Sequence, residues 1–264
     1  MEKVNTNGIQ IAYTRRGKGY PLLLVHGWGV DHTVWNDVAL LMESDFELIL
    51  PDLRGFGESS VIEGYYNITD MATDLSGLLD QLGIEKIAIA GHSMGNYVSL
   101  AFVRAYPERV LGLGIISSQA QADPIERKQR LYESAEVIMN TGVKSVLESL
   151  SPLMATDERV QAQIRSLIKR QHPAGLAGAL KAMADREDSS SILSRFTFPV
   201  VLIHGQADEF MPIHRAQEIK EAISHATLTE LPGIGHTPIL ENPKATVNSL
   251  KNIIDSSTFK NTEV

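Results

Sequence analysis

Short runs of apolar residues recur in two parts of this chain, one before residue 117 and one after residue 199. The runs are nearly continuous and span residues 20–25, 46–50, 86–90 and 200–203, with weaker members at 111–116 and 226–231. Such runs are typical of strands in a parallel sheet, because helices bury both faces of that sheet. Residues 9–13 instead alternate apolar and polar side chains, which indicates a half-buried antiparallel strand.

Helical periodicity fills the gaps between these runs. The expected helices span residues 33–42, 69–82, 94–106, 212–224 and 243–254. Two of them have start signals, since Asn242 can cap a helix that begins at Pro243, and Pro212 can take the same first position in another. Strands that alternate with helices predict a doubly wound, mostly parallel sheet with a ligand site beyond the carboxyl ends of its strands.

The alternation stops between residues 119 and 194. This segment holds successive amphipathic helices without an apolar strand, and Leu131, Ala135 and Ile138, for example, share one face. We interpret it as a helical cap inserted after the sixth main strand. The chain then divides into a core of residues 1–118 and 195–264 and a cap of residues 119–194. The alternative is a set of extra helices that pack on the sheet and have no role at the site.

Composition narrows the class of protein. The chain has 264 residues, 43% hydrophobic and 21% charged, as in a soluble globular domain. Its formal charge of −8 repels phosphate backbones and anionic lipids, so we expect neither nucleic acid nor a membrane as a partner. There is no cysteine, which excludes disulfides, a thiolate nucleophile and cysteine-ligated metals. A start without a secretion signal favours the cytoplasm.

The clearest candidate for chemistry is a serine between an expected strand and an expected helix. Gly91-His92-Ser93-Met94-Gly95 directly follows the apolar run that ends at residue 90. A sharp turn at this place raises the serine Oγ, and the glycines allow neighbouring segments to approach closely. The spacing alone is weak evidence, because a glycine-rich turn can hold an incidental serine. The strand before it and the helix after it favour a nucleophile.

A serine hydroxyl needs a base to deprotonate it. His236 follows the last expected strand in a loop that contains Gly233 and Gly235, so it can reach the carboxyl edge of the sheet where Ser93 is expected. His204 ends a strand, and we interpret it as a packed structural residue. The remaining candidates are interpreted as ordinary solvated histidines: His32, His172, His214 and His225.

The base in turn needs an acid that orients its ring. Asp208 lies on the loop beyond the run at 200–203 and completes the chain order serine, acid, histidine. Asp123, after the expected sixth strand, competes with it, and Glu209 is a weaker candidate. We assign Asp52 and Arg54, in a turn rich in proline and glycine, a structural role.

The oxyanion of an acyl-transfer intermediate needs two hydrogen-bond donors. The backbone N–H of Met94, next to the nucleophile, is one candidate, and that of Trp28 in His26-Gly27-Trp28-Gly29 is the other. Both side chains are also expected to line the substrate pocket. Simple core packing is the alternative for the Trp28 indole.

In their order along the chain these motifs resemble the α/β-hydrolase superfamily over nearly the whole length. The resemblance implies the α/β-hydrolase fold, a mostly parallel eight-stranded sheet flanked by helices with a helical cap after the sixth strand. Ser93 argues against the epoxide hydrolase and haloalkane dehalogenase branches, which carry aspartate there. The chain is similar to carboxylesterases, enol-lactonases, carbon–carbon bond hydrolases and cofactor-free peroxidases. Asn96 departs from many relatives, which have a further glycine.

We therefore expect a carboxylesterase that cleaves a small-molecule ester through an acyl-enzyme, with neither a metal nor an organic cofactor. The alternative reaction is that of an enol-lactonase or a carbon–carbon bond hydrolase. A different class of function, a small-molecule receptor or regulatory partner on the same scaffold, also stays open. The sequence leaves the natural substrate and the oligomeric state undetermined.

Overall fold

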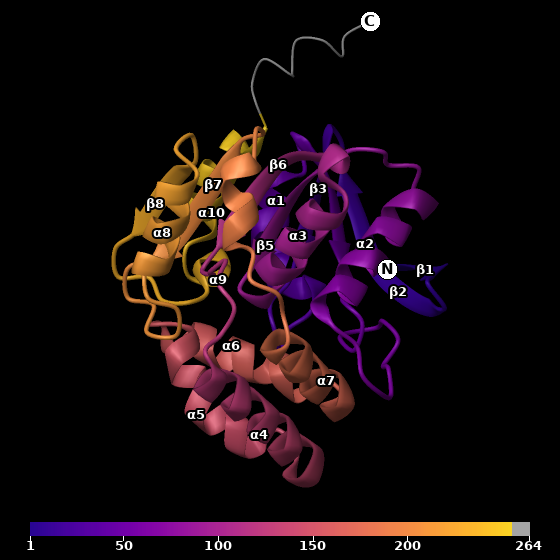
Figure 1. Ribbon diagram of the computed structural model, residues 1–264, viewed down its shortest axis with the longest axis vertical. Helices are drawn as coiled ribbons and strands as arrows, with labels where there is room; N and C mark the ends of the chain where they lie inside the picture. Colours follow the sequence, from indigo (N-terminus) through magenta and orange to yellow (C-terminus); the bar gives the residue numbers. More distant parts are fainter. Residues whose placement is uncertain (255–264) are drawn as a thin grey trace, which may run out of the picture.

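The computed structural model describes residues 1–254 and places eight strands in one sheet (Figure 1). The strands are β1 (Glu2–Thr6), β2 (Ile9–Gly17), β3 (Tyr20–Val25), β4 (Phe46–Pro51), β5 (Ile87–His92), β6 (Val110–Ile116), β7 (Val200–Gly205) and β8 (Thr227–Leu231). Their spatial order is β1-β2-β4-β3-β5-β6-β7-β8. β2 pairs antiparallel with both β1 and β4, and the other neighbouring strands pair in parallel, which confirms the expected mostly parallel sheet. Residues 255–264 of the expected core lie outside the described residues.

The continuous apolar runs are explained by two hydrophobic clusters, one on each face of the sheet. Leu23 of β3 belongs to the first cluster, whereas Leu22 and Leu24 belong to the second. The first cluster includes side chains from α2 (Ile68–Gln81), α3 (Met94–Ala105) and α8 (His214–Ala222), and the second from α1 (Asn36–Met42), α9 (Pro238–Glu241) and α10 (Pro243–Leu250). Because both faces of the sheet are buried, its central strands carry apolar side chains on both sides and show no alternation of apolar and polar residues.

Three element boundaries differ from the sequence prediction. β1 is polar and has no apolar run, but it pairs with β2 along its whole length. The expected helix at 33–42 divides into a 3-10 turn, η1 (His32–Trp35), and α1. Pro212 is not the first residue of α8, which begins at His214. Asn242, by contrast, caps α10 as expected, since its side chain accepts a hydrogen bond from the N–H of Ala245.

Four helices lie between β6 and β7: α4 (Ile125–Thr141), α5 (Lys144–Met154), α6 (Glu158–Lys169) and α7 (Pro173–Ala184). A 3-10 turn, η3 (Ser190–Arg195), then leads back to the sheet. Figure 1 shows these four helices as one group, below the body that the sheet forms with its flanking helices. We call α4–α7 the helical insertion. Every helix within residues 1–254 is too short or too polar to cross a lipid bilayer.

Charged and polar side chains tie the helical insertion to the sheet. The Arg170 guanidinium pairs with Asp31 in the loop after β3, and the Gln171 amide donates to Asp31 and accepts from the N–H of Gly57. Burial raises the pKa of Asp31, but hydrogen bonds from Thr33, Arg170 and Gln171 outweigh it and lower the pKa to about 2. The carboxylate is therefore held in its charged form at this junction.

Asp52 and Arg54 are both engaged in contacts with their surroundings. Asp52 is fully buried and accepts hydrogen bonds from the N–H of Glu58 and from the His32 ring, at 2.9 and 2.7 Å. Arg54 forms two hydrogen bonds with Asp74 on α2. The interpretation of His32 as a solvated histidine is wrong, because its side chain is only 12% exposed and is fixed by Asp52.

Candidate active site

Ser93 lies at the junction between β5 and α3 in a strained backbone conformation. Its φ of 52° and ψ of −117° are rare for a residue with a side chain. The turn is possible because its flanking residues are glycines. A Cβ at Gly95 would lie 2.3 Å from the carbonyl oxygen of Val25, and one at Gly91 would lie 2.4 Å from the nitrogen of Asn96. The expected turn that presents the serine Oγ is therefore built from backbone contacts that only glycine permits.

His236 joins Ser93 to Asp208 in a continuous hydrogen-bonded chain. Its Nε2 lies 2.9 Å from the Ser93 Oγ, and its Nδ1 lies 2.8 Å from the Asp208 Oδ2. The imidazole is fully buried in the loop after β8. Asp208 lies 115 residues after Ser93 along the chain, and His236 lies 28 residues after Asp208, so only the fold brings the three side chains together. This arrangement can remove a proton from a serine hydroxyl.

The loop after β7 fixes the Asp208 carboxylate. Its Oδ1 accepts hydrogen bonds from the backbone N–H groups of Phe210 and Met211, at 3.0 and 2.8 Å. The Oδ2 is thereby directed to His236. His204, the residue interpreted as packed, is buried beneath this loop, and its Nε2 donates to the carbonyl of Met211 at 2.6 Å. Burial lowers the pKa of His204, which keeps the ring neutral as a donor.

The competing carboxylate, Asp123, makes other contacts. Its Oδ2 pairs with Arg186 at 2.5 Å, and both side chains are buried. Its Oδ1 accepts from the Gln119 amide at 3.1 Å and pairs with Arg127 at 3.3 Å. Glu209 is exposed. Asp208 rather than Asp123 or Glu209 is thus the carboxylate that contacts His236.

The two expected oxyanion donors lie on segments that pack against Ser93. Met94 is the first residue of α3, so its N–H has no acceptor within the helix. A Cβ at Gly27 would lie 3.4 Å from the Ser93 Cβ, which places the loop of Trp28 beside the serine. The Trp28 indole lines the cavity over Ser93 and donates to the carbonyl of Leu176 on α7. The Met94 side chain, expected to line the pocket, is instead fully buried and does not line it.

His92 belongs to the site, although the sequence analysis gave it no role. Its ring is buried, and its Nε2 lies 2.8 Å from the backbone carbonyl oxygen of His236. Burial lowers the pKa of His92 to about 3, so the ring is neutral and Nε2 must carry the proton that this carbonyl accepts. Phe210 packs edge-on against the His236 ring at 4.8 Å. No local pattern could reveal either contact, since both depend on loops far apart along the chain.

A cavity of about 540 Å³ opens beside Ser93 and His236. Its wall is mostly apolar and combines core residues such as Trp28 and Phe210 with side chains from all parts of the helical insertion. The apolar members from the insertion are Leu131, Val146, Leu150, Leu153, Met154, Ile164, Leu180 and Met183. The volume is that of a typical small-molecule site.

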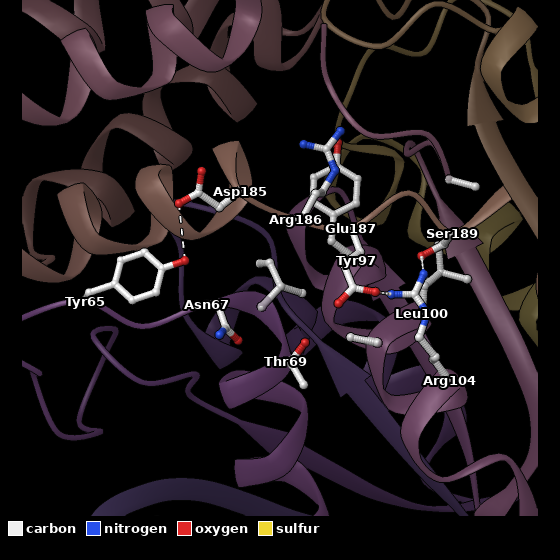
Figure 2. A pocket seen from close by; sticks show the side chains of 13 residues that line it. Tyr65, Asn67, Thr69, Tyr97, Leu100, Arg104, Asp185, Arg186, Glu187 and Ser189 are labelled. Atoms are coloured by element: carbon white, nitrogen blue, oxygen red, sulfur yellow. Dashed lines mark hydrogen bonds and ion pairs between the residues drawn. The ribbon is translucent and has the colours of Figure 1, made fainter. Parts of the chain in front are cut away.

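Figure 2 shows the residues of a second cavity, of about 110 Å³, and Tyr97 lines both cavities. Figure 2 shows Arg104 directed to Glu187 and Ser189, and Tyr65 directed to Asp185. These groups satisfy one another. Because neither Ser93 nor His236 lines this cavity, we assign the chemistry to the larger one.

One group of side chains could in principle bind a metal ion. Ligand atoms of Asp31, His32 and Asp52 lie within 4.8 Å of one another. Each carboxylate already has strong partners, since Asp31 holds Arg170 and Gln171 and Asp52 holds the His32 ring. We therefore interpret the group as part of the junction between the sheet and the helical insertion.

Comparisons with known proteins agree with this fold. The model of the alpha/beta hydrolase fold family matches residues 20–243. A thermophilic esterase from Thermogutta terrifontis, solved with malate bound, is 33% identical, covers 95% of this chain and 97% of its own, and superposes with a TM-score of 0.91. The enol-lactonase from Burkholderia xenovorans LB400 is 21% identical over 96% and 99% of the two chains, with a TM-score of 0.88. Lipase 1 from Psychrobacter immobilis is 27% identical over 93% of this chain and 80% of its own.

Proposed function

This chain belongs to the α/β-hydrolase fold family, and on that premise we propose that it is a carboxylesterase with Ser93 as nucleophile, His236 as base and Asp208 as the acid that orients it. The observation that carries the proposal is the hydrogen-bonded chain from the Ser93 Oγ through both nitrogens of His236 to the Asp208 carboxylate. The similarity to an esterase and a lipase supports ester hydrolysis over other reactions of the fold.

In the proposed acylation step, the Ser93 Oγ attacks the ester carbonyl carbon while the His236 Nε2 takes the hydroxyl proton. The backbone N–H groups of Trp28 and Met94 stabilise the oxyanion of the tetrahedral intermediate. The bond to the alcohol oxygen then breaks, and the alcohol leaves with the proton from His236. Asp208 stabilises the transient imidazolium through its contact with Nδ1.

Water completes the cycle by the same groups. It attacks the carbonyl carbon of the acyl-Ser93 ester while His236 removes one of its protons. Collapse of the second intermediate releases the carboxylic acid and returns the proton to the Ser93 Oγ. Protein groups and water fill every role. The apolar wall of the cavity supports an ester with an aliphatic or aromatic acyl part.

The direct test compares wild type with Ser93→Ala on p-nitrophenyl esters, simple lactones and diketone acids. We expect wild type to hydrolyse the esters with a burst of p-nitrophenol, and Ser93→Ala to lose about 10⁴-fold or more of kcat. Mass spectrometry of the quenched burst should show wild type, and not the variant, carrying one acyl group.

Ser99→Ala is the matched control. This serine is buried on α3, where its hydroxyl donates to the backbone carbonyl of Gly95, and we give it no part in the reaction. It should keep the burst. Turnover of lactones or diketone acids with negligible ester hydrolysis would overturn the carboxylesterase assignment in favour of the alternative reactions. Tight binding of these compounds without turnover would overturn the assignment to an enzyme.

A further inference from the structure

The wall of the active-site cavity formed by α4 carries two arginines. Arg127, Arg130 and Ser134 line the cavity at spacings of three and four residues, so they share one face of the helix. Arg127 also lies 5.2 Å from the centre of the Phe210 ring, and Phe210 packs against the ring of His236. One phenyl ring therefore separates a guanidinium from the proposed catalytic base.

Positive charge exceeds negative charge along this wall. Asp123 is the one carboxylate among the residues that line the cavity, and the buried Arg186 pairs with its Oδ2. Arg127 shares the other oxygen at 3.3 Å with the Gln119 amide. Arg130 donates only to the backbone carbonyl of Glu126, and within residues 1–254 no carboxylate lies within ion-pair distance of it. Two guanidinium groups and one carboxylate thus line the cavity, and the carboxylate already pairs with Arg186 behind it.

This local excess is opposite in sign to the protein as a whole, whose formal charge is −8. A general electrostatic preference for anions is therefore not expected of the chain. The excess lies on the α4 wall of a cavity whose lining is otherwise mostly apolar. A ligand that matches both features has an apolar spacer with an anionic group at one end, because guanidinium binds carboxylate through strong charge-assisted hydrogen bonds.

We propose that Arg127 and Arg130 form a subsite for an anionic group and that the preferred substrates are esters that carry a carboxylate at the end remote from the scissile bond. The inference rests on the proposed esterase function and names its substrate class. Arg130, which has no carboxylate partner in the described part of the chain, is expected to contribute most of the selectivity. Arg127 is expected to contribute less because Asp123 partly neutralises it.

The test uses pairs of substrates that differ only in charge. Monoethyl esters of adipic, pimelic and suberic acids are compared with ethyl esters of the monocarboxylic acids of the same chain length, and hydrolysis is followed by proton release at constant pH. We expect kcat/KM to be about tenfold higher for the anionic member of the best pair, as a charge-assisted contact at a partly exposed site allows. Added sodium chloride should reduce this advantage.

Variants of α4 then localise the effect. Arg130→Gln should lower the ratio of anionic to neutral kcat/KM about tenfold, and Arg127→Gln should lower it less. Lys128→Gln is the matched control, since it removes the same charge from the same helix at a position that does not line the cavity. It should leave the ratio and the activity unchanged.

An inhibition measurement tests binding of the anionic group without requiring turnover of the charged compound itself. Adipate should inhibit hydrolysis of a neutral p-nitrophenyl ester competitively and more strongly than hexanoate, and Arg130→Gln should remove the difference. Equal hydrolysis of charged and neutral esters, with no difference between the two inhibitors, would overturn this subsite and leave the esterase assignment intact. Failure of wild type on every ester would overturn the esterase assignment itself.

Discussion

The two walls of the active-site cavity are built in opposite ways. On the sheet side, His236 and Asp208 are buried and every nitrogen and oxygen of their side chains takes part in a hydrogen bond. On the side of the helical insertion, Leu131, Val146 and Leu150 are only half-buried, and Arg130 is exposed. The first wall is held by directional contacts and the second mainly by apolar packing.

This difference indicates how the two walls divide the work in the proposed reaction. Hydrogen bonds fix angles and distances, which deprotonation of Ser93 requires. Apolar packing tolerates substitution of side chains with similar volume, so the wall formed by the helical insertion can change its shape without disturbing the proton transfer. We therefore expect substitutions on the sheet side to change kcat, and those on the insertion side to change selectivity or stability.

Two aspartates give the largest contrast between the walls. Asp208→Asn should lower kcat about 10⁴-fold, because an amide cannot hold His236 in the tautomer that accepts the serine proton. Asp123→Asn should instead lower the free energy of unfolding by about 3 kcal/mol, because it leaves Arg186 buried without its counter-charge. Steady-state kinetics and urea unfolding on both variants measure the two effects. A large loss of kcat in folded Asp123→Asn, with Asp208→Asn nearly as active as wild type, would reverse the assignment of the acid.

The junction between the walls should give an intermediate, pH-dependent effect on stability. The pKa of Asp31 is about 2 in the folded protein, against 3.8 for an aspartate free of these contacts, as in the unfolded chain. The Asp31 carboxylate therefore stabilises the fold fully above pH 3.8 and loses this effect as the pH falls through about 2. Asp31→Asn should therefore lower the free energy of unfolding at neutral pH by about 2 kcal/mol. The difference from wild type should shrink as the pH approaches 2.

Urea unfolding at a series of pH values checks this expectation. Asp157→Asn is the matched control, because Asp157 also caps a helix and pairs with an arginine, Arg159, but does so at the surface of the helical insertion. It should have a smaller effect. A penalty for Asp31→Asn that stays constant from neutral pH down to about 2 would show that the carboxylate charge does not tie the walls together.

The smallest expected effect comes from substitutions of His92, a buried residue of the sheet side of the cavity. The His92 ring holds His236 through the backbone carbonyl of His236, and we give His92 a positioning role. His92→Leu should lower kcat about tenfold with little change in KM, because His236 loses one of its restraints. His92→Gln offers a donor at a similar distance and should recover most of the rate.

The rate measured against pH separates positioning from titration. Because the pKa of His92 is about 3, its ring stays neutral at the pH values where the enzyme is assayed, and the limbs of the wild-type and His92→Gln profiles should coincide. Equal losses in the leucine and glutamine variants would indicate that the ring acts by packing alone.

Much of the sheet wall was predictable from local sequence. Apolar runs located β3, β4, β5 and β7, and glycines on either side of Ser93 indicated the tight turn. The positions of Asp208 and His236 after successive strands placed them at one edge of the sheet. Boundaries were less predictable. β1 has no apolar run because it lies at the edge of the sheet with most of its side chains exposed, and α8 begins two residues later than Pro212 suggests.

Other contacts could not be predicted, since they join segments that are far apart along the chain. His236 contacts Asp208, whereas Asp123 pairs with Arg186, which lies 63 residues after it along the chain. The expected pocket role of the Met94 side chain was wrong because the first turn of α3 directs it into the core. The partner of the His92 ring is 144 residues away.

The sequence by itself determined the alternation of strands and helices, the turn that presents Ser93 and the set of residues able to form its hydrogen-bonded chain, because these depend on side-chain periodicity and on close backbone approaches that leave room only for glycine. The tertiary structure alone decided which carboxylate joins that chain, what His92 holds and how the arginines of α4 line the cavity. Those outcomes depend on distances between segments that the chain brings together only when its apolar surfaces are buried.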